Sequence, residues 1–370
     1  MKRGNQNRLE SEEPFRFIFI TRHFNHSGYL ILEKLIERGL TPTAVVLKEE
    51  NDPLLNRITR PFVLIWYYLK CWFYRCPPLK TLDSEELLAK KYSIPVIKTK
   101  TMKDENFVRV VSSFQPDLMV MGGGWHELIL ENVITIPRLG CINTHPSLLP
   151  EFRGTSITRW QRLYGISTSG VSVHYVNNEF DTGEVIAQKE MPVPIDITPQ
   201  ELFYQLGNLA AEMIPGLVLR FAEEGQLPAI KKTIDSPYCQ YYRRWKWDLE
   251  KLKIDFSQSL RSIHFFISAN TQESYQYLGP LCKINGQQFF IRQSKLLERP
   301  TDLMNNQQVF EYEIGKVFLK DHTLYLFREK EKEFLAISRI QKFDGYYKLR
   351  RSNTPDKYIK INERIQIEES

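Results

Sequence analysis

Short apolar runs alternate with amphipathic stretches through the first half of the chain. The runs at 15–21 and 43–47 are rich in β-branched or aromatic residues and predict strands, and apolar residues at helical spacing predict a helix over 27–38. The same order returns downstream, where a strand is predicted at 94–97 and a helix at 106–114. Such alternation favours an α/β fold with a Rossmann-like, mostly parallel sheet that carries helices on both faces.

A long helix is predicted after two further strands, at 170–176 and 185–192. Thr198 and Glu201 have the spacing of a capping box, with a proline between them in the first helical turn. Pro215 is expected to kink or split this helix, because proline removes a helical hydrogen bond.

Beyond about residue 240 the pattern becomes β-rich. Asn285-Gly286 separates two strand-like runs and predicts a two-residue hairpin, and Asp321-His322 separates two more. We therefore expect a small OB-like β-barrel domain to follow the α/β domain. The predicted division is a catalytic domain at 14–240, the OB-like domain at 250–350 and a tail at 351–370.

Composition is ordinary for a soluble globular protein: 42% of the 370 residues are apolar and 25% are charged. The five cysteines are an odd number, widely spread, and form no CxxC pair. They indicate neither a disulfide framework nor a metal site. The N-terminus has no pattern of a signal peptide. We expect a cytoplasmic protein.

The positive charge lies in the C-terminal third. From Tyr241 to Ser370 there are 23 basic and 17 acidic residues, which accounts for the whole net charge of +6. A basic domain suits an anionic partner such as RNA, a nucleotide or a membrane surface. The alternative is a solvated surface with a modest excess of lysine.

The segment at 61–76 (PFVLIWYYLKCWFYRC) is almost entirely aromatic and apolar. It is too short to span a bilayer, which needs about 20 residues. Three interpretations remain open: a buried core helix, a membrane-surface helix, or a wall over the pocket for the acceptor substrate. Of the last two we favour the pocket wall, and membrane contact stays a possible but less favoured role.

Two short motifs carry the candidate chemistry. Asn143 and His145 lie two positions apart at the end of a predicted strand, so their side chains share one face. Pro146 ends the strand, which places the pair at the carboxyl edge of the sheet, where open α/β sheets bind ligands. Asp181 lies in a later loop, and the intervening crossover can bring it beside His145.

An amide, an imidazole and a carboxylate suit acyl transfer to an amine. Asn143 and a protonated His145 can donate hydrogen bonds to a tetrahedral oxyanion. Asp181 can fix the imidazole tautomer, raise its pKa and help to collect the proton of the attacking amine. Each residue alone has a structural explanation, as a strand end or a turn, but the combination points to catalysis.

The stretch from about Pro116 to Val193 resembles the folate-dependent formyltransferases, especially those acting on methionyl-tRNA. The matching elements are INTHPSLLP, RG, GVSVHYV and FDTGEVIAQ. The resemblance implies 10-formyltetrahydrofolate as formyl donor, no metal, and Asn143, His145 and Asp181 as the catalytic set. It also implies a cis peptide between Leu149 and Pro150. The folate contacts implied by the resemblance are Ser147, Leu148, Leu149, Pro150, Gly123, Gly124, Asn177 and Phe180.

The amine acceptor is less well defined. The region from Tyr242 to Gln341 resembles the C-terminal barrel of methionyl-tRNA formyltransferases, which favours tRNA bound through the basic domain. Two features depart from those enzymes: the residues after Gly154, and the aromatic segment 61–76 where they carry a basic loop. An amino-sugar nucleotide therefore remains an alternative acceptor. Hydrolysis of 10-formyltetrahydrofolate and an inactive folate- or RNA-binding module are further alternatives, although the intact triad argues against the last.

Overall fold

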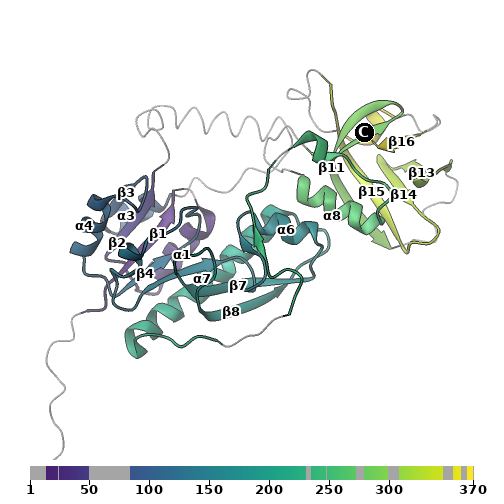
Figure 1. The fold of residues 1–370 in the computed structure, drawn as a ribbon. Helices are drawn as coiled ribbons and strands as arrows, with labels where there is room; N and C mark the ends of the chain where they lie inside the picture. The colour runs from purple at the N-terminus through teal and green to yellow at the C-terminus, as the bar shows by residue number, and fades with distance from the viewer. Residues whose placement is uncertain are drawn as a thin grey trace, which may run out of the picture.

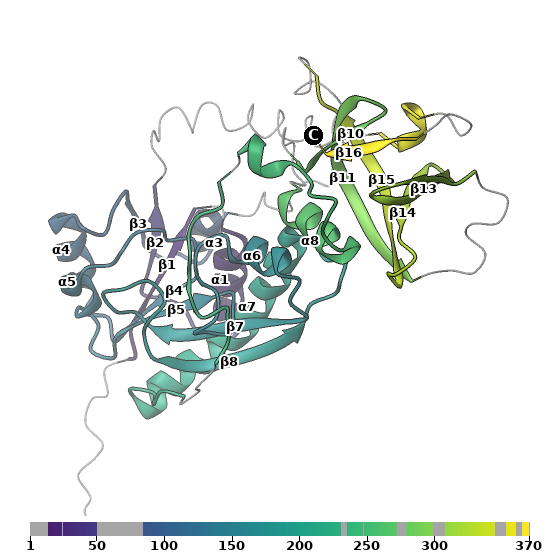
Figure 2. The same cartoon turned by 45° about the vertical axis from the view of Figure 1, so that its right-hand side comes forward.

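The computed structural model describes residues 14–23, 25–49, 84–230, 235–246, 248–271, 279–298, 308–344, 353–359 and 365–369. An α/β domain occupies one side of the molecule and a β-rich domain the other, with α6 and α8 side by side between them (Figures 1 and 2). The aromatic segment 61–76 lies outside the described residues, so its three interpretations stay predictions.

The first domain is built on a seven-stranded sheet with the order β3-β2-β1-β4-β5-β7-β8. The pairs among the first five of these strands are parallel, whereas β7 and β8 add to the edge as an antiparallel pair. The strands are β1 (Phe17–Arg22), β2 (Ala44–Lys48), β3 (Val96–Thr99), β4 (Leu118–Met121), β5 (Cys141–His145), β7 (Thr168–Tyr175) and β8 (Val185–Pro192). The predicted Rossmann-like, mostly parallel sheet is confirmed.

Helices cover both faces of this sheet, as predicted. Along β1, Phe17 and Phe19 share a buried cluster with residues of α1 (His26–Glu37), α3 (Glu85–Lys91) and α7 (Pro199–Glu224). The alternate residues Ile18 and Ile20 pack instead with side chains from α4 (Glu105–Ser113) and α5 (Glu131–Ile134). The period of two along the strand therefore sorts its apolar side chains between two helical layers.

The predicted capping box at the start of α7 is present. The Thr198 hydroxyl accepts from the Glu201 backbone N–H at 3.2 Å, and a Glu201 carboxylate oxygen accepts from the Thr198 backbone N–H at 3.0 Å. Helix α7 is continuous through Pro215, so the expected split does not occur. Although α7 is long and apolar enough to cross a membrane, its buried residues belong to the core against α1.

The second domain is a curled antiparallel sheet with the order β12-β13-β14-β15-β11-β10-β16 (Figure 2). It confirms the predicted barrel-like C-terminal domain. The helix α8 (Leu260–Asn270) packs against β11 and β15 and shares their apolar core. The strands are β10 (Leu281–Ile284), β11 (Gln287–Glu298), β12 (Phe310–Tyr312), β13 (Gly315–Lys320), β14 (Thr323–Phe327), β15 (Glu333–Lys342) and β16 (Ile367–Glu369).

Both predicted hairpin turns are found in this domain. Asn285 and Gly286 have φ of 49° and 75°, and Asp321 and His322 have φ of 46° and 64°. Positive φ at both central positions is the geometry of a type I′ turn, which matches the twist of the flanking strands.

Part of the expected C-terminal tail belongs to the barrel-like domain. The strand β16 pairs with β10, and Ile365 and Ile367 are buried in the same core. The sequence pattern did not reveal this because a three-residue edge strand is too short to show periodicity.

The two domains meet where α6 (Ile157–Leu163) packs against α8. Arg162 is fully buried there, donates to the Ile195 backbone oxygen and lies with its guanidinium 5.1 Å from the ring centroid of Phe265. Burial lowers the pKa of Arg162 to about 10, against the opposing charge of Asp196. The Ile195 carbonyl and the ring of Phe265 therefore stabilise the positive charge of Arg162.

Replacing Thr198 by alanine is expected to lower the free energy of unfolding by about 1 kcal/mol, because the α7 cap loses its side-chain acceptor. Chemical denaturation measures the change. Ser113→Ala, at an exposed hydroxyl that bonds within α4, is the matched control and should change stability by less than about 0.5 kcal/mol. Equal effects of the two substitutions would contradict the assigned cap.

Candidate functional site

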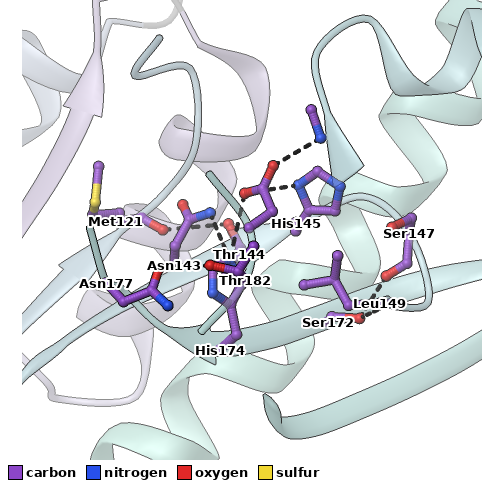
Figure 3. Close-up of polar contacts among 12 residues, drawn as sticks. Met121, Asn143, Thr144, His145, Ser147, Leu149, Ser172, His174, Asn177 and Thr182 are labelled. Atoms are coloured by element: carbon purple, nitrogen blue, oxygen red, sulfur yellow. Dashed lines mark hydrogen bonds and ion pairs between the residues drawn. The ribbon is translucent and has the colours of Figure 1, made fainter. Parts of the chain in front are cut away.

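The site forms where β5 ends and pairs with β7. In the antiparallel register Asn143 faces His174, and His145 faces Ser172. Figure 3 shows Asn143, His145 and His174 converging from these two strands. The structure thus brings Asn143 and His145 together at the carboxyl edge, as predicted, next to the end of β4.

His145 is held between two hydrogen-bond acceptors. Its Nδ1 lies 3.4 Å from Oδ1 of Asp181, and its Nε2 lies 2.8 Å from the Phe152 backbone oxygen. The His145 side chain is only 4% exposed and that of Asp181 is 12% exposed. A ring with an acceptor at each nitrogen is best satisfied when both nitrogens carry a proton, which favours the imidazolium.

The electrostatics agree with a charged pair. Burial acts to lower the pKa of His145, but the charge and hydrogen bond of Asp181 and the Phe152 carbonyl raise it above its ordinary value. Burial acts to raise the pKa of Asp181, but the charge and hydrogen bond of His145 hold it well below its usual range. The site therefore stores a positive imidazole beside a negative carboxylate.

His174 is a residue of the site that the sequence analysis did not single out. Its Nδ1 lies 2.8 Å from the Tyr175 backbone oxygen, so Nδ1 carries the proton and donates. Its Nε2 then accepts from the Asn143 amide nitrogen at 3.1 Å, which orients the amide. The signal was in the sequence, since GVSVHYV predicts a strand, but the β5–β7 register was needed to place His174 opposite Asn143.

A folded-back loop carries Asp181 to this face. Asp181 has φ of 55°, and its Oδ2 accepts from the Gly154 backbone N–H at 2.9 Å. Gly183 passes so close to β7 that an added Cβ would overlap the Tyr175 carbonyl oxygen. A side chain at position 183 would therefore push the loop, and with it the carboxylate, away from His145.

The predicted folate contacts at positions 147–150 lie in the loop after Pro146, and several of their groups are buried or bonded within the protein. The Ser147 hydroxyl is buried and donates to the Glu151 backbone oxygen at 2.6 Å, and the Leu149 N–H donates to the Ser172 hydroxyl at 2.9 Å. The peptide between Leu149 and Pro150 is cis, as expected. Leu148 is also buried. The folate contacts expected of this loop remain predictions, and the bonds of Ser147 and Leu149 fix the loop's shape.

The other predicted folate contacts lie after β4 and in the loop that carries Asp181. Gly123 and Gly124 follow β4 with φ of 89° and 78°, and at Gly124 a Cβ would collide with the Asn25 side chain. The Asn177 amide oxygen accepts from the Thr182 hydroxyl at 3.0 Å, which braces the Asp181 loop. Phe180 is 38% exposed and lies 6.1 Å from the Tyr241 ring.

The arrangement can stabilise negative charge and move a proton without a protein nucleophile. Cys141 is completely buried, and burial raises the pKa of its thiol to about 12, so it stays a neutral core residue. The amide of Asn143 and the charged His145 are instead suited to a developing oxyanion.

Comparison with known proteins agrees with this chemistry. Residues 76–218, which include the whole cluster, match the model of the formyl transferase family. A methionyl-tRNA formyltransferase of Syntrophus aciditrophicus is 34% identical over 152 residues, which cover 41% of this chain and 46% of that protein. The methionyl-tRNA formyltransferase of Clostridioides difficile is 32% identical over 178 residues, which cover 48% and 55%. The chain thus spans about half the length of these curated relatives.

Solved structures with the same fold cover more of the chain at lower identity. An N-formyltransferase from Helicobacter canadensis, in complex with folinic acid and dTDP-3-aminofucose, has a TM-score of 0.58 and 16% identity over 89% of this chain and 100% of that one. HypX from Aquifex aeolicus with tetrahydrofolic acid has a TM-score of 0.53 and 14% identity over 96% and 51%. These likenesses show that the arrangement of a Rossmann-like and a C-terminal β domain is shared.

Replacing Asp181 by asparagine should lower the pKa of His145 below its ordinary value, because burial then acts without the opposing carboxylate charge. Titration of the His145 ring by NMR measures this shift. Asp196→Asn, which changes the carboxylate 3.5 Å from His264 at the domain interface, is the matched control and should leave His145 unchanged. A His145 pKa that does not move in Asp181→Asn would show that the pair is not coupled.

Proposed function

We propose that this protein transfers a formyl group from 10-formyltetrahydrofolate to the primary amine of methionyl-tRNA, because residues 76–218 match the model of the formyl transferase family. The observation that carries the proposal is the partly buried cluster of Asn143, His145 and Asp181 at the carboxyl edge of the sheet, within the matched stretch. This edge is where open α/β sheets bind their ligands.

In the proposed reaction the amine nitrogen attacks the formyl carbon of the folate. The C=O π electrons move to the oxygen, and the bond between the carbon and N10 breaks when the tetrahedral intermediate collapses. The amine loses one proton, and N10 gains one as it leaves. The transfer needs no metal and no covalent enzyme intermediate.

The side chains of the cluster have distinct roles in this proposal. The Asn143 amide has a second N–H beyond the one engaged by His174, and this N–H stabilises the oxyanion. His145 supplies a positive charge beside the same oxygen. Asp181 keeps His145 protonated and relays the amine proton through a water.

The folate is proposed to bind between the segment after β4 and the loop that carries Asp181. Gly123 and Gly124 offer backbone without side chains, which permits close approach of a flat ring. Phe180 offers an exposed aromatic surface on the Asp181 loop. These features support the prediction that the pterin contacts Gly123, Gly124, Asn177 and Phe180.

The choice of tRNA as acceptor rests on charge and on the curated relatives. The surplus of six basic residues after Tyr241 lies in the part of the chain that builds the barrel-like domain. A basic domain attached to a formyltransferase domain suits a polyanionic acceptor better than a free amine. The names of the relatives with 32 to 34% identity point to the same acceptor.

Single substitutions Asn143→Ala, His145→Ala and Asp181→Ala should each reduce formyl transfer by about 100-fold or more, since each removes a contribution to oxyanion stabilisation. Turnover with 10-formyltetrahydrofolate and methionyl-tRNA measures the loss, and circular dichroism checks folding. His322→Ala, at an exposed residue of the barrel-like domain, is the control and should keep full activity. Near-native turnover of His145→Ala would refute the mechanism.

Binding of methionyl-tRNA should weaken by at least about tenfold between roughly 50 and 200 mM salt, because counterions are released from the phosphates on binding. Filter binding or fluorescence titration measures Kd at each salt concentration. Salt-independent acceptor binding would instead favour a small, weakly charged acceptor such as an amino-sugar nucleotide. Formate release at the same rate with and without acceptor would indicate a hydrolase.

A further inference from the structure

A cavity of about 370 Å³ lies behind the catalytic loop, bounded by residues 148–152, α6 with the connection to β7, and Tyr238. It shares one residue, Leu148, with the expected folate contacts. Gly123, Gly124 and the Asp181 loop are not among the residues that line the cavity.

Two buried polar groups beside this cavity lack a partner among the described residues. They are the amide oxygen of Gln161 and the hydroxyl of Ser169, and both residues are only 1% exposed. The Gln161 amide nitrogen donates to the Pro146 backbone oxygen at 3.2 Å, which leaves the amide oxygen as an acceptor. Buried polar groups normally have a hydrogen-bond partner, so a ligand in the cavity could supply the partner of these two groups.

Aromatic side chains form a wall of the cavity. The Phe152 ring stacks on that of Tyr238 at 4.9 Å, and Tyr164 lies 5.2 Å from Tyr238. Glu151 adds a carboxylate whose position is set by a hydrogen bond from Ser236. Flat rings of this kind stack with planar heteroaromatic ligands.

The charge of the lining selects among such ligands. None of the residues that line the cavity is basic, and Glu151 is acidic, so phosphate and carboxylate groups are disfavoured there. Gln161 and Glu151 accept hydrogen bonds, while the hydroxyls of Ser167, Thr168 and Ser169 can donate them. A neutral ring that has an exocyclic amino group can donate to the acceptors, and its ring nitrogens can accept from the hydroxyls. Adenine has this pattern of donors and acceptors.

A single residue, Phe152, contacts both the cavity and His145. Phe152 lines the cavity, and its backbone oxygen lies 2.8 Å from His145 Nε2. Gln161 connects the other side to Pro146, the residue after His145. A group bound in the cavity would therefore hold an attached amine near the formyl site.

We propose that this cavity binds the adenine base at the 3′ end of the acceptor tRNA. The inference rests on the proposed function, because it takes the terminal adenosine as the part of the acceptor that carries the amino acid. The base stacks on Tyr164 beside Tyr238, its amino group donates to Gln161, and the phosphate backbone stays outside the cavity, whose lining includes the acidic Glu151.

Direct binding to the full-length protein tests the site. Adenosine should bind saturably, and Tyr164→Ala should raise its Kd by roughly tenfold through the loss of stacking. Tyr164 is 42% exposed, so its removal does not open the core. Tyr92→Ala, at a tyrosine 47% exposed beyond the end of α3, is the matched control and should leave Kd unchanged. Thymidine, which lacks the amino group, should bind more weakly than adenosine.

Three results would overturn the assignment: no saturable adenosine binding, an unchanged Kd in Tyr164→Ala, or thymidine binding as tightly as adenosine. A second variant, Gln161→Leu, removes the acceptor while keeping the side-chain size similar. It should weaken adenosine more than thymidine. Equal weakening of the two nucleosides would show that Gln161 does not recognise the amino group.

Kinetics separate this proposal from the proposed function. With methionyl-tRNA, Tyr164→Ala should raise KM by roughly tenfold while kcat and folate affinity stay near native values. If Tyr164→Ala formylates methionyl-tRNA with an unchanged KM, the cavity assignment is wrong, whereas methionyl-tRNA remains the proposed acceptor. Adenosine binding that depends on Tyr164, without formylation of methionyl-tRNA, would show an adenine-binding cavity but overturn both tRNA as the acceptor and the assignment of the cavity to its 3′ end.

Discussion

The carboxylate of Asp181 is the constraint on which the site depends. It accepts a backbone hydrogen bond from Gly154 and faces the rings of His145 and His174, at 3.4 and 3.6 Å. Taking a carboxylate and an imidazolium out of water costs several kcal/mol each, and their attraction offsets this cost only when the geometry is good. The pair therefore adds little net stability but strongly penalises any arrangement in which one charge loses its partner.

The Asp181 carboxylate also links segments that are far apart in the sequence. The Asp181 loop is tied to Gly154, whose two-residue strand β6 (Arg153–Gly154) runs beside β9 (Tyr241–Tyr242). A Cβ at Gly154 would collide with the Tyr242 backbone, so the approach is close. Tyr242 also stacks on Phe152, the residue whose carbonyl oxygen faces His145. The start of the connection to the barrel-like domain thus helps to shape the loop around His145.

The sequence predicted the parts of this site that depend on local pattern. The strand that ends in Asn143 and His145 follows from alternation and a terminal proline, and the loop position of Asp181 follows from its glycine. His174 could not be assigned because its role depends on the register between β5 and β7. The same holds for the Phe152 carbonyl and the Gly154 N–H, which are backbone groups and have no signature in the side-chain sequence.

The fold was predictable to a similar degree and for similar reasons. The parallel strands, the capping box of α7 and both type I′ turns each rest on a few adjacent residues. The edge strand β16 and the domain contact through Arg162 depend on partners over 70 residues away. The segment 61–76 remains a prediction, since it lies outside the described residues.

Phe152 lies between His145 and the cavity lined by Gln161 and Tyr238. Its backbone oxygen holds a proton of His145 in place, while its ring packs between Tyr238 and Tyr242 at 4.9 and 5.1 Å. A rotation of the ring without a movement of the backbone is restricted by these stacked neighbours, because close-packed interiors resist such changes. Any displacement of the ring would therefore move the carbonyl away from His145 and leave the second imidazole proton unpaired. The geometry of the cluster of Asn143, His145 and Asp181 thus depends on how the ring of Phe152 is packed.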